Sequence, residues 1–271
     1  MIQNLPINNT DVPEDYVGAW RKRSNIELSF WLQTHRLHAS LSIPLHRPDF
    51  AGRQTWADFS DDELILLAQQ GGVSGACIAQ DDILHRRRQI DYLPRRGDPY
   101  LRRMHRDTTL LKEETLDGRD QVVWELLADG RTEIVALRFQ DAGIGADSDD
   151  QRRGYLLIAG DYFLFVRDRL VATQRADSLA TLIELKEPER AQLIELLDFE
   201  ISFGMRPTDN HPWLIQHSTI PYRERCPLMD NRTLHEIIAQ AGQGPRQIRW
   251  GGKRFFRYWS LDEYQPAQTN K

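Results

Sequence analysis

The chain has 271 residues, of which 40% are hydrophobic and 28% charged, so it can form one large or two ordinary folded domains and is not disordered. Its net charge of −5 at pH 7 argues against a dedicated nucleic-acid binder. Two cysteines, Cys77 and Cys226, are too few for a disulfide framework, and the longest apolar runs are too short to span a bilayer. Since the first fifteen residues contain no signal peptide pattern, we predict a cytoplasmic protein that does not associate with membranes.

The clearest pattern in the first half is in residues 28–44, which we interpret as two adjacent strands that end at Pro44. The polar-face residues that alternate with the apolar ones are Ser29, Trp31, Gln33, His38, Ser40 and Ser42. One apolar and one mixed face are typical of a barrel wall that lines a ligand cavity. A sandwich edge that faces water gives the same alternation, so both interpretations stay open.

The rest of the first half predicts one helix and further strands. Ser60 and Glu63 have the spacing of a capping box, and Gly71-Gly72 ends the predicted helix. Strands follow at residues 73–79, 84–92, 108–114 and 121–127, the last two joined by the hairpin signal Asp117-Gly118. With those around Trp20 and in residues 28–43, about seven strands are expected, which suits a small barrel.

The second half is predicted to be similar in kind, so we place a domain boundary at residue 129. Strands are expected at 132–139, 154–166 (a hairpin), 199–203, 213–220, 246–250 and 254–259, and helices at 178–185, 188–197 and 232–241. Residues 141–153 are polar and acidic and are predicted to form a mobile surface loop. The two predicted domains are residues 1–129 and 130–271.

Gly18-Ala19-Trp20, near the start of a β domain, resembles the first-strand signature of the lipocalins and wider calycins. In those proteins the tryptophan plugs the closed end of the barrel and an arginine commonly packs across it, which implies a structural plug formed by Gly18 and Trp20. The segments YVGAWRKRS, FWLQTHRLHASLSIP, RQIDYLP, LLDFEISFG and STIPYRE resemble a family of uncharacterised bacterial proteins. That family is more distantly similar to a fungal protein built of two lipocalin-like barrels. The resemblance implies a mainly β fold of two lipocalin-like (calycin-type) antiparallel β-barrels with a few inserted helices, and no established activity, substrate or cofactor.

Sequence signatures of catalysis and metal binding are not found. The eight histidines include no HExxH, and there is no phosphate-binding glycine loop or dinucleotide fingerprint. Gly72-Val73-Ser74-Gly75-Ala76 lacks the second glycine of a serine nucleophile elbow at the required place. We therefore predict neither a metal site nor a cofactor.

The candidate site is the polar face of the first barrel. Trp31, Gln33, His38 and Ser40 share this face, and the strand that holds His85, Arg87 and Asp91 could converge with them. We predict that these side chains line a pocket for an unidentified small molecule, without catalysis. Two alternatives remain: a hydrolase- or isomerase-type enzyme, with His38 or His85 as general base oriented by Asp91, and a protein–protein interaction module with filled barrels.

Arginines are concentrated in residues 86–106, together with the aromatic side chains of Tyr92 and Tyr100. This composition also occurs in polyanion-binding surfaces. Because arginines paired with acids elsewhere in the chain are the more frequent explanation, no nucleic-acid partner is predicted. The ligand and the oligomeric state do not follow from the sequence.

Overall fold

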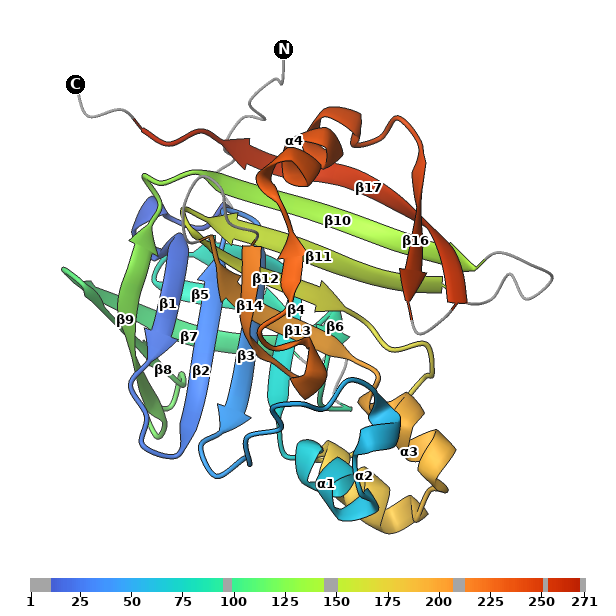
Figure 1. Ribbon diagram of the computed structural model, residues 1–271. Helices are drawn as coiled ribbons and strands as arrows, with labels where there is room; N and C mark the ends of the chain where they lie inside the picture. Colours follow the sequence, from blue (N-terminus) through green and yellow to red (C-terminus); the bar gives the residue numbers. More distant parts are fainter. Residues whose placement is uncertain (1–10, 95–98, 144–150, 207–212, 251–252, 269–271) are drawn as a thin grey trace.

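Two antiparallel sheets contain about half of the residues of the computed structural model, which describes residues 11–94, 99–143, 151–206, 213–250 and 253–268 (Figure 1). The prediction of a mainly β fold with a few helices is confirmed. The chain passes from the first sheet to the second between Asp129 and Ile134, which is where the domain boundary was placed.

The first sheet is a closed barrel. Its strands are β1 (Gly18–Lys22), β2 (Glu27–Gln33), β3 (Leu37–Pro44), β4 (Gly71–Gln80), β5 (Ile83–Arg87), β6 (Ile90–Asp91), β7 (Pro99–Asp107), β8 (Leu110–Glu114) and β9 (Gln121–Asp129). They are hydrogen-bonded in the order β3-β2-β1-β9-β8-β7-β5-β4, and β4 pairs with β3 to close the ring. The short β6 pairs with Val73 and Ser74 of β4, and so continues along β4 beyond the residues that pair with β5.

The second sheet curves without closing, and is a half-barrel. Its strands are β10 (Ile134–Gly143), β11 (Gln151–Ala159), β12 (Tyr162–Arg167), β13 (Glu200–Met205), β14 (Trp213–Ser218), β15 (Pro227–Met229), β16 (Pro245–Trp250) and β17 (Lys253–Gln265). The order is β15-β14-β13-β12-β11-β10-β17-β16, and within the described ranges no pairing joins the edge strands β15 and β16. The second barrel of the predicted pair is therefore open on one side.

Helices cover the open side of the half-barrel and one end of the molecule. They are α1 (Asp61–Leu67), α2 (Leu179–Lys186), α3 (Arg190–Leu197) and α4 (Asn231–Gln240), with short 3₁₀ turns at Glu14–Tyr16, Trp56–Asp58 and Pro221–Arg223. The first three α-helices gather at one end, while α4 lies over the second sheet (Figure 1). The predicted capping box begins α1, because the Ser60 hydroxyl accepts from the Glu63 N–H at 3.2 Å and Glu63 Oε2 accepts from the Ser60 N–H at 2.8 Å.

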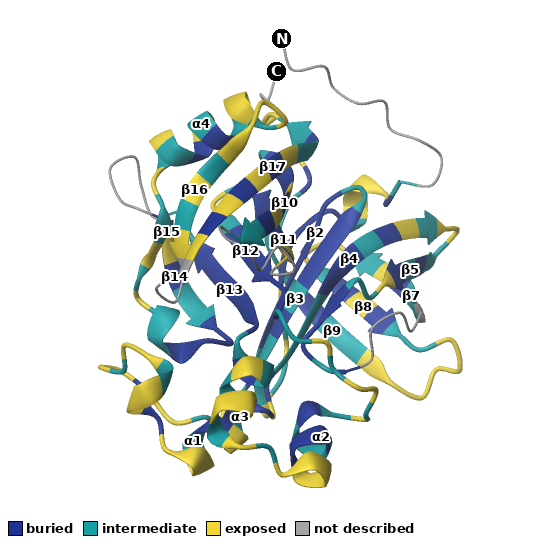
Figure 2. Cartoon of the chain, turned by 90° about the vertical axis from the view of Figure 1, so that its right-hand side faces the viewer, coloured by how far each residue is buried: buried dark blue, intermediate teal, exposed yellow. Residues whose placement is uncertain are grey.

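The outer face of β2 and β3 packs against the second sheet, so both faces of these strands are buried (Figure 2). Phe30 stacks on Phe203 with ring centroids 3.8 Å apart, and Leu32 and Leu41 belong to the same apolar core. The polar row of these strands points into the barrel instead. Trp31 is only 2% exposed, so the alternative of a sandwich edge that faces water is wrong.

Several local predictions differ from the structure. Gly71-Gly72 was expected to end the helix, but α1 ends at Leu67 and the two glycines begin β4. Residues 84–92 were expected to form one strand, but the strand breaks after Arg87 and resumes as β6. The strand β7 was not predicted. Residues 141–143 and 151–153 continue β10 and β11 as a long hairpin, and only the remainder of the expected loop lies outside the described residues.

Candidate functional site

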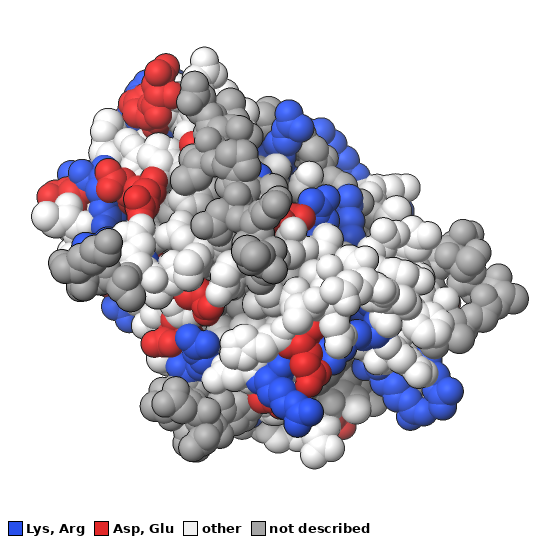
Figure 3. Space-filling model, turned by 90° about the horizontal axis from the view of Figure 1, so that it is seen from above, with Lys and Arg blue, Asp and Glu red and all other residues white. Residues whose placement is uncertain are grey.

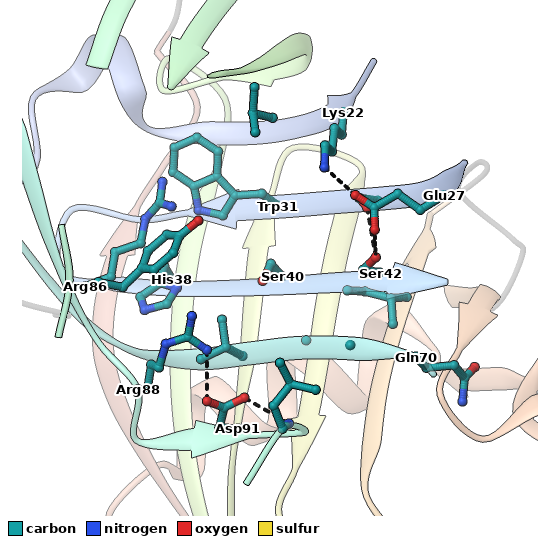
Figure 4. Close-up of a pocket in the computed structure, with 18 of the residues that line it drawn as sticks. Lys22, Glu27, Trp31, His38, Ser40, Ser42, Gln70, Arg86, Arg88 and Asp91 are labelled. Carbon is teal, nitrogen blue, oxygen red and sulfur yellow. Dashed lines mark hydrogen bonds and ion pairs between the residues drawn. The ribbon is translucent and has the colours of Figure 1, made fainter. Parts of the chain in front are cut away.

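A cavity of about 370 Å³ lies inside the first barrel (Figure 4). The polar row of β2 and β3 forms one wall, and β4, β5, β7, β8 and β9 supply the others. Lys22 donates to Glu27, and Ser42 also donates to Glu27, at the end of the cavity where these side chains are partly exposed. This end forms the mouth, and Trp31, His38 and Arg86 lie deeper (Figure 4).

Arg86 is the central charged group of the inner end. Its guanidinium carbon lies 4.3 Å from the centroid of the Trp31 ring, and its Nη1 donates to Glu113 Oε1 at 3.0 Å. Trp124 Nε1 donates to Glu113 Oε2 at 2.7 Å, and Arg102 Nε lies 3.4 Å from Oε1, so both carboxylate oxygens have partners. Burial lowers the pKa of Arg86, but the Glu113 carboxylate, together with Cys77 and Tyr100, raises it by more, so the pKa is above its ordinary value and the group stays cationic.

Several buried polar atoms of this wall have no hydrogen-bond partner in the protein. They are Trp31 Nε1, His38 Nε2, and Nε and Nη2 of Arg86. The three side chains are 2%, 1% and 6% exposed, respectively. Leaving a buried donor or acceptor unpaired costs about 1–3 kcal/mol each, and more for a charged group. The inner end of the cavity therefore carries hydrogen-bonding capacity that the fold itself does not use.

His38 is neutral in the folded protein. Burial, followed by the positive charges of Arg86 and Arg88, lowers its pKa to about 3. One ring nitrogen hydrogen-bonds the backbone of Arg87, while Nε2 has no partner. A neutral imidazole has one N–H, and the Arg87 carbonyl accepts a hydrogen bond from it. Nε2 therefore carries a lone pair and acts as an acceptor.

Asp91 is held by Arg88 rather than by a histidine. Arg88 Nη1 donates to Asp91 Oδ2 at 2.9 Å, and the Leu93 N–H donates to Oδ1 at 3.0 Å. Burial raises the pKa of Asp91, and Arg88 partly opposes this shift. Across the described ranges, no histidine nitrogen is hydrogen-bonded to Asp91, so the acid–base pair that the enzyme alternative requires is not assembled with His38 or His85.

The cavity brings together four of the predicted site residues: Trp31, His38, Ser40 and Asp91. The other three lie elsewhere. Gln33 is buried nearer the turn after β2, where its Nε2 donates to the carbonyls of Thr34 and Leu37 at 2.8 and 3.1 Å.

The expected convergence of Arg87 and His85 with this face is not observed. Leu84 and Arg86 are the buried positions of β5, so the residues that alternate with them face outward, and Arg87 is exposed. The chain then breaks strand geometry at residues 88–89, which brings Arg88 and Asp91 back to the cavity.

Sequence reasoning missed most of the other lining side chains, including the charged and aromatic ones of the inner end: Arg86, Arg88, Tyr100, Glu113 and Trp124. The apolar Leu84 was the available signal for the phase of β5, because it marks the inward positions. No comparable local signal marks Glu113, whose partner Arg86 is 27 residues away.

The closed end of the barrel is filled by Trp20, which is 0% exposed and donates from Nε1 to the Tyr16 carbonyl at 3.1 Å. The Arg106 guanidinium lies over its ring, 4.6 Å from the centroid. Gly18 has φ +141°, and a Cβ there would lie 2.1 Å from the Ala128 carbonyl oxygen, so only glycine fits. Trp20 is thus fully buried beneath Arg106 at this end of the barrel.

The arginines of β5 and β7 are largely paired with acids. Besides the Glu113 and Asp91 contacts, Arg103 lies 3.2 Å from Asp82 and 3.4 Å from Glu114. The face of the molecule shown in Figure 3 carries basic and acidic side chains interspersed with uncharged ones.

A second cavity, of about 400 Å³, lies between the second sheet, α4 and β15. Its charged side chains are all paired. Arg257 donates from Nε and Nη2 to the two oxygens of Asp141 at 2.6 and 2.7 Å. Arg246 donates to Glu236 at 2.7 Å, and Arg223 donates to the buried Glu200 carboxylate at 3.3 Å.

Among the residues that the structure describes, no group of three or more His, Cys, Asp or Glu side chains is arranged to hold a metal ion. In the same residues, no helix has both the length and the apolar character needed to cross a membrane. Comparisons with protein-family models, with curated proteins and with solved structures find no match.

Proposed function

We propose that the chain binds a small organic molecule in the cavity of the first barrel. The observation that carries this proposal is the set of unpartnered buried atoms on Trp31, His38 and Arg86. A polar core that serves only stability pairs its members, because each orphaned group costs free energy. A ligand that supplies the missing partners recovers that cost.

The cavity volume supports the same proposal. About 370 Å³ is within the range of small-molecule sites. An interaction module with filled barrels needs no such space, and catalysis by a His/Asp pair needs a contact that Asp91 makes with Arg88 instead. Binding without catalysis is therefore the function that the geometry favours.

We also propose that the protein is lipocalin-like and that it is located in the cytoplasm. The buried Trp20 beneath Arg106 is the arrangement that a lipocalin-like plug would have, which supports the resemblance. Cys77 and Cys226 are both free thiols, which supports a reducing, cytoplasmic location.

A thermal-shift screen of the whole protein against a broad metabolite library tests the binding function. A true ligand at a hundredfold its Kd adds about 2.7 kcal/mol to the free energy of unfolding, which is a readily measured shift. Ser40 lies on the cavity wall, and Ser40→Phe places a ring in that space. We expect this variant to fold and to lose every shift that is due to the first barrel.

The matched control is Thr233→Phe, which fills the second cavity in the same way. It should leave the ligand shifts unchanged. Shifts that survive Ser40→Phe and vanish in Thr233→Phe, or a library that gives no shift at all, would overturn the proposed function.

A further inference from the structure

We propose that the ligand of the first barrel is a small organic monoacid, with its carboxylate on Arg86 and Trp31 and a hydroxyl or N–H donor on His38. This inference rests on the proposed function and names the chemical class of the ligand.

The free edge of Arg86 matches a carboxylate. Nε and Nη2 form the edge of a guanidinium that grips a carboxylate through two parallel hydrogen bonds. The same two atoms of Arg257 hold Asp141 in the second sheet, at 2.6 and 2.7 Å. In Arg86 one face covers Trp31 and Nη1 holds Glu113, but this edge has no hydrogen-bond partner.

The neighbours of Arg86 do not substitute for that carboxylate. The Cys77 thiol lies beside it, but burial raises the pKa of Cys77 to about 11, so the thiol is neutral and a weak acceptor. Both oxygens of Glu113 already accept hydrogen bonds, Oε1 from Arg86 Nη1 and Oε2 from Trp124 Nε1. Because these atoms are buried in the free protein, binding requires a rotamer change of Arg86, and such side-chain changes are common when sites bind.

The charge balance favours a single negative charge. At the inner end the lining guanidinium groups of Arg86 and Arg88 face the carboxylates of Asp91 and Glu113. Arg102 does not line the cavity, but its Nε lies 3.4 Å from Glu113 Oε1, so Glu113 is shared by two arginines. With Arg102 included, these described groups have one positive charge in excess, while Lys22 and Glu27 compensate each other at the mouth. His38 and Tyr100 add no charge, because burial lowers the pKa of His38 to about 3 and raises that of Tyr100. A monoanion neutralises this site, whereas a dianion overcompensates it.

The remaining free atoms define the second polar group of the ligand. Trp31 Nε1 is a donor and adds to the carboxylate site. His38 Nε2 is an acceptor, so it requires a hydroxyl or N–H on the ligand. An acid without such a donor leaves His38 unpaired and should bind more weakly.

Isothermal titration calorimetry on the whole protein tests this class with 2-, 3- and 4-hydroxybenzoate, which place the donor at three distances from the carboxylate. Benzoate lacks the donor, and the three matching hydroxybenzamides lack the charge. We expect at least one hydroxybenzoate to bind. Removing its charge should weaken binding about tenfold to a hundredfold, as for a lost charged hydrogen bond.

Trp31→Phe identifies the site without touching the Arg86–Glu113 pair. Because the indole N–H has no protein partner, the variant should fold and bind the acid about threefold to tenfold more weakly. Trp259→Phe in the second cavity is the matched control and should bind as the natural chain does. Arg86→Gln should abolish binding, and circular dichroism establishes whether that variant remains folded.

Three results would overturn the monoacid inference: hydroxybenzamides that bind as tightly as the acids, inorganic phosphate that binds as tightly, or no binding of any hydroxybenzoate. If neutral metabolites nevertheless bind and Ser40→Phe removes them, the proposed function survives while the ligand class fails. If nothing binds, both fail.

Discussion

Two cavities of this protein have similar volumes, about 370 Å³ in the first barrel and about 400 Å³ under α4. They differ in how completely their buried arginine is hydrogen-bonded. Arg257 donates hydrogen bonds from Nε and Nη2 to Asp141, whereas the same atoms of Arg86 have no hydrogen-bond partner. Volume therefore does not distinguish a site from a packing space in this fold. Of the two described cavity linings, only that of the first barrel includes buried polar atoms without a hydrogen-bond partner.

The largest effect is expected from the paired arginine. Asp141→Leu leaves Arg257 buried and uncompensated and should lower the free energy of unfolding by about 3–5 kcal/mol. The double variant Asp141→Leu, Arg257→Met removes both charges and should recover much of that loss. Denaturant unfolding measures both values. A single-variant cost under about 1 kcal/mol, the scale of surface changes, would show that the pairing of Arg257 has little weight.

A pH titration sharpens the description of the first cavity. The folded protein protonates His38 only near its pKa of about 3, whereas the unfolded chain does so near 6.5. Between these values the unfolded state binds the additional proton, so the free energy of unfolding falls as the pH falls. At about pH 4 the loss should be about 3 kcal/mol relative to neutral pH.

Replacing His38 by Gln should remove this component of the pH dependence. His217 is the control, because burial also lowers its pKa but it lies outside the first cavity. His217→Gln should keep the His38 component. A pH profile unchanged by His38→Gln would contradict a neutral, buried His38.

The smallest effects come from two tryptophans that line the same cavity. Trp124 Nε1 donates to Glu113 Oε2, so Trp124→Phe leaves a buried carboxylate oxygen without this donor. The change should lower the free energy of unfolding by about 1–3 kcal/mol beyond the effect of the lost ring volume. Trp31→Phe removes a donor that has no partner and should lack this additional cost. Since both changes remove similar volumes, the difference in unfolding free energy isolates the hydrogen bond. Equal costs would mean that Trp31 Nε1 is not an unused donor.

How far the sequence could predict this arrangement depends on local patterning. In β2 and β3 the alternation of Phe30 and Leu32 with Trp31 was enough to place Trp31 and His38 on one shared face, but not to decide whether that face lines a barrel or meets water. The alternation is clear there because the apolar row is buried between two sheets. The helix start at Ser60 was also predictable, since the capping box is a local signal.

The arginine-rich strands could not be assigned in the same way. Three consecutive arginines follow His85, so Leu84 is the single apolar residue that marks which positions at this end of β5 face inward. The prediction chose Arg87, whereas Arg86 faces inward. The strand β7 was missed because its inward positions include Arg102 and Arg106, which pair with a buried carboxylate or cover an indole ring. These partners are distant in sequence, as are Asp141 and Arg257, which are 116 residues apart. Sequence patterns of period two carry no information about such pairs.

The central claim is that the free polar atoms of the first barrel, rather than the space in either cavity, mark the ligand site. The most direct test follows the indole N–H resonances in ¹H–¹⁵N spectra of the whole protein as 3-hydroxybenzoate or another bound acid is added, with Trp31 assigned by its loss in Trp31→Phe. We predict that the Trp31 resonance moves with ligand concentration. That of Trp213, whose Nε1 already donates to Asn231 Oδ1 at 2.6 Å, and that of Trp259, which lines the second cavity, should stay in place. Binding that shifts Trp259 and leaves Trp31 unchanged would contradict the claim.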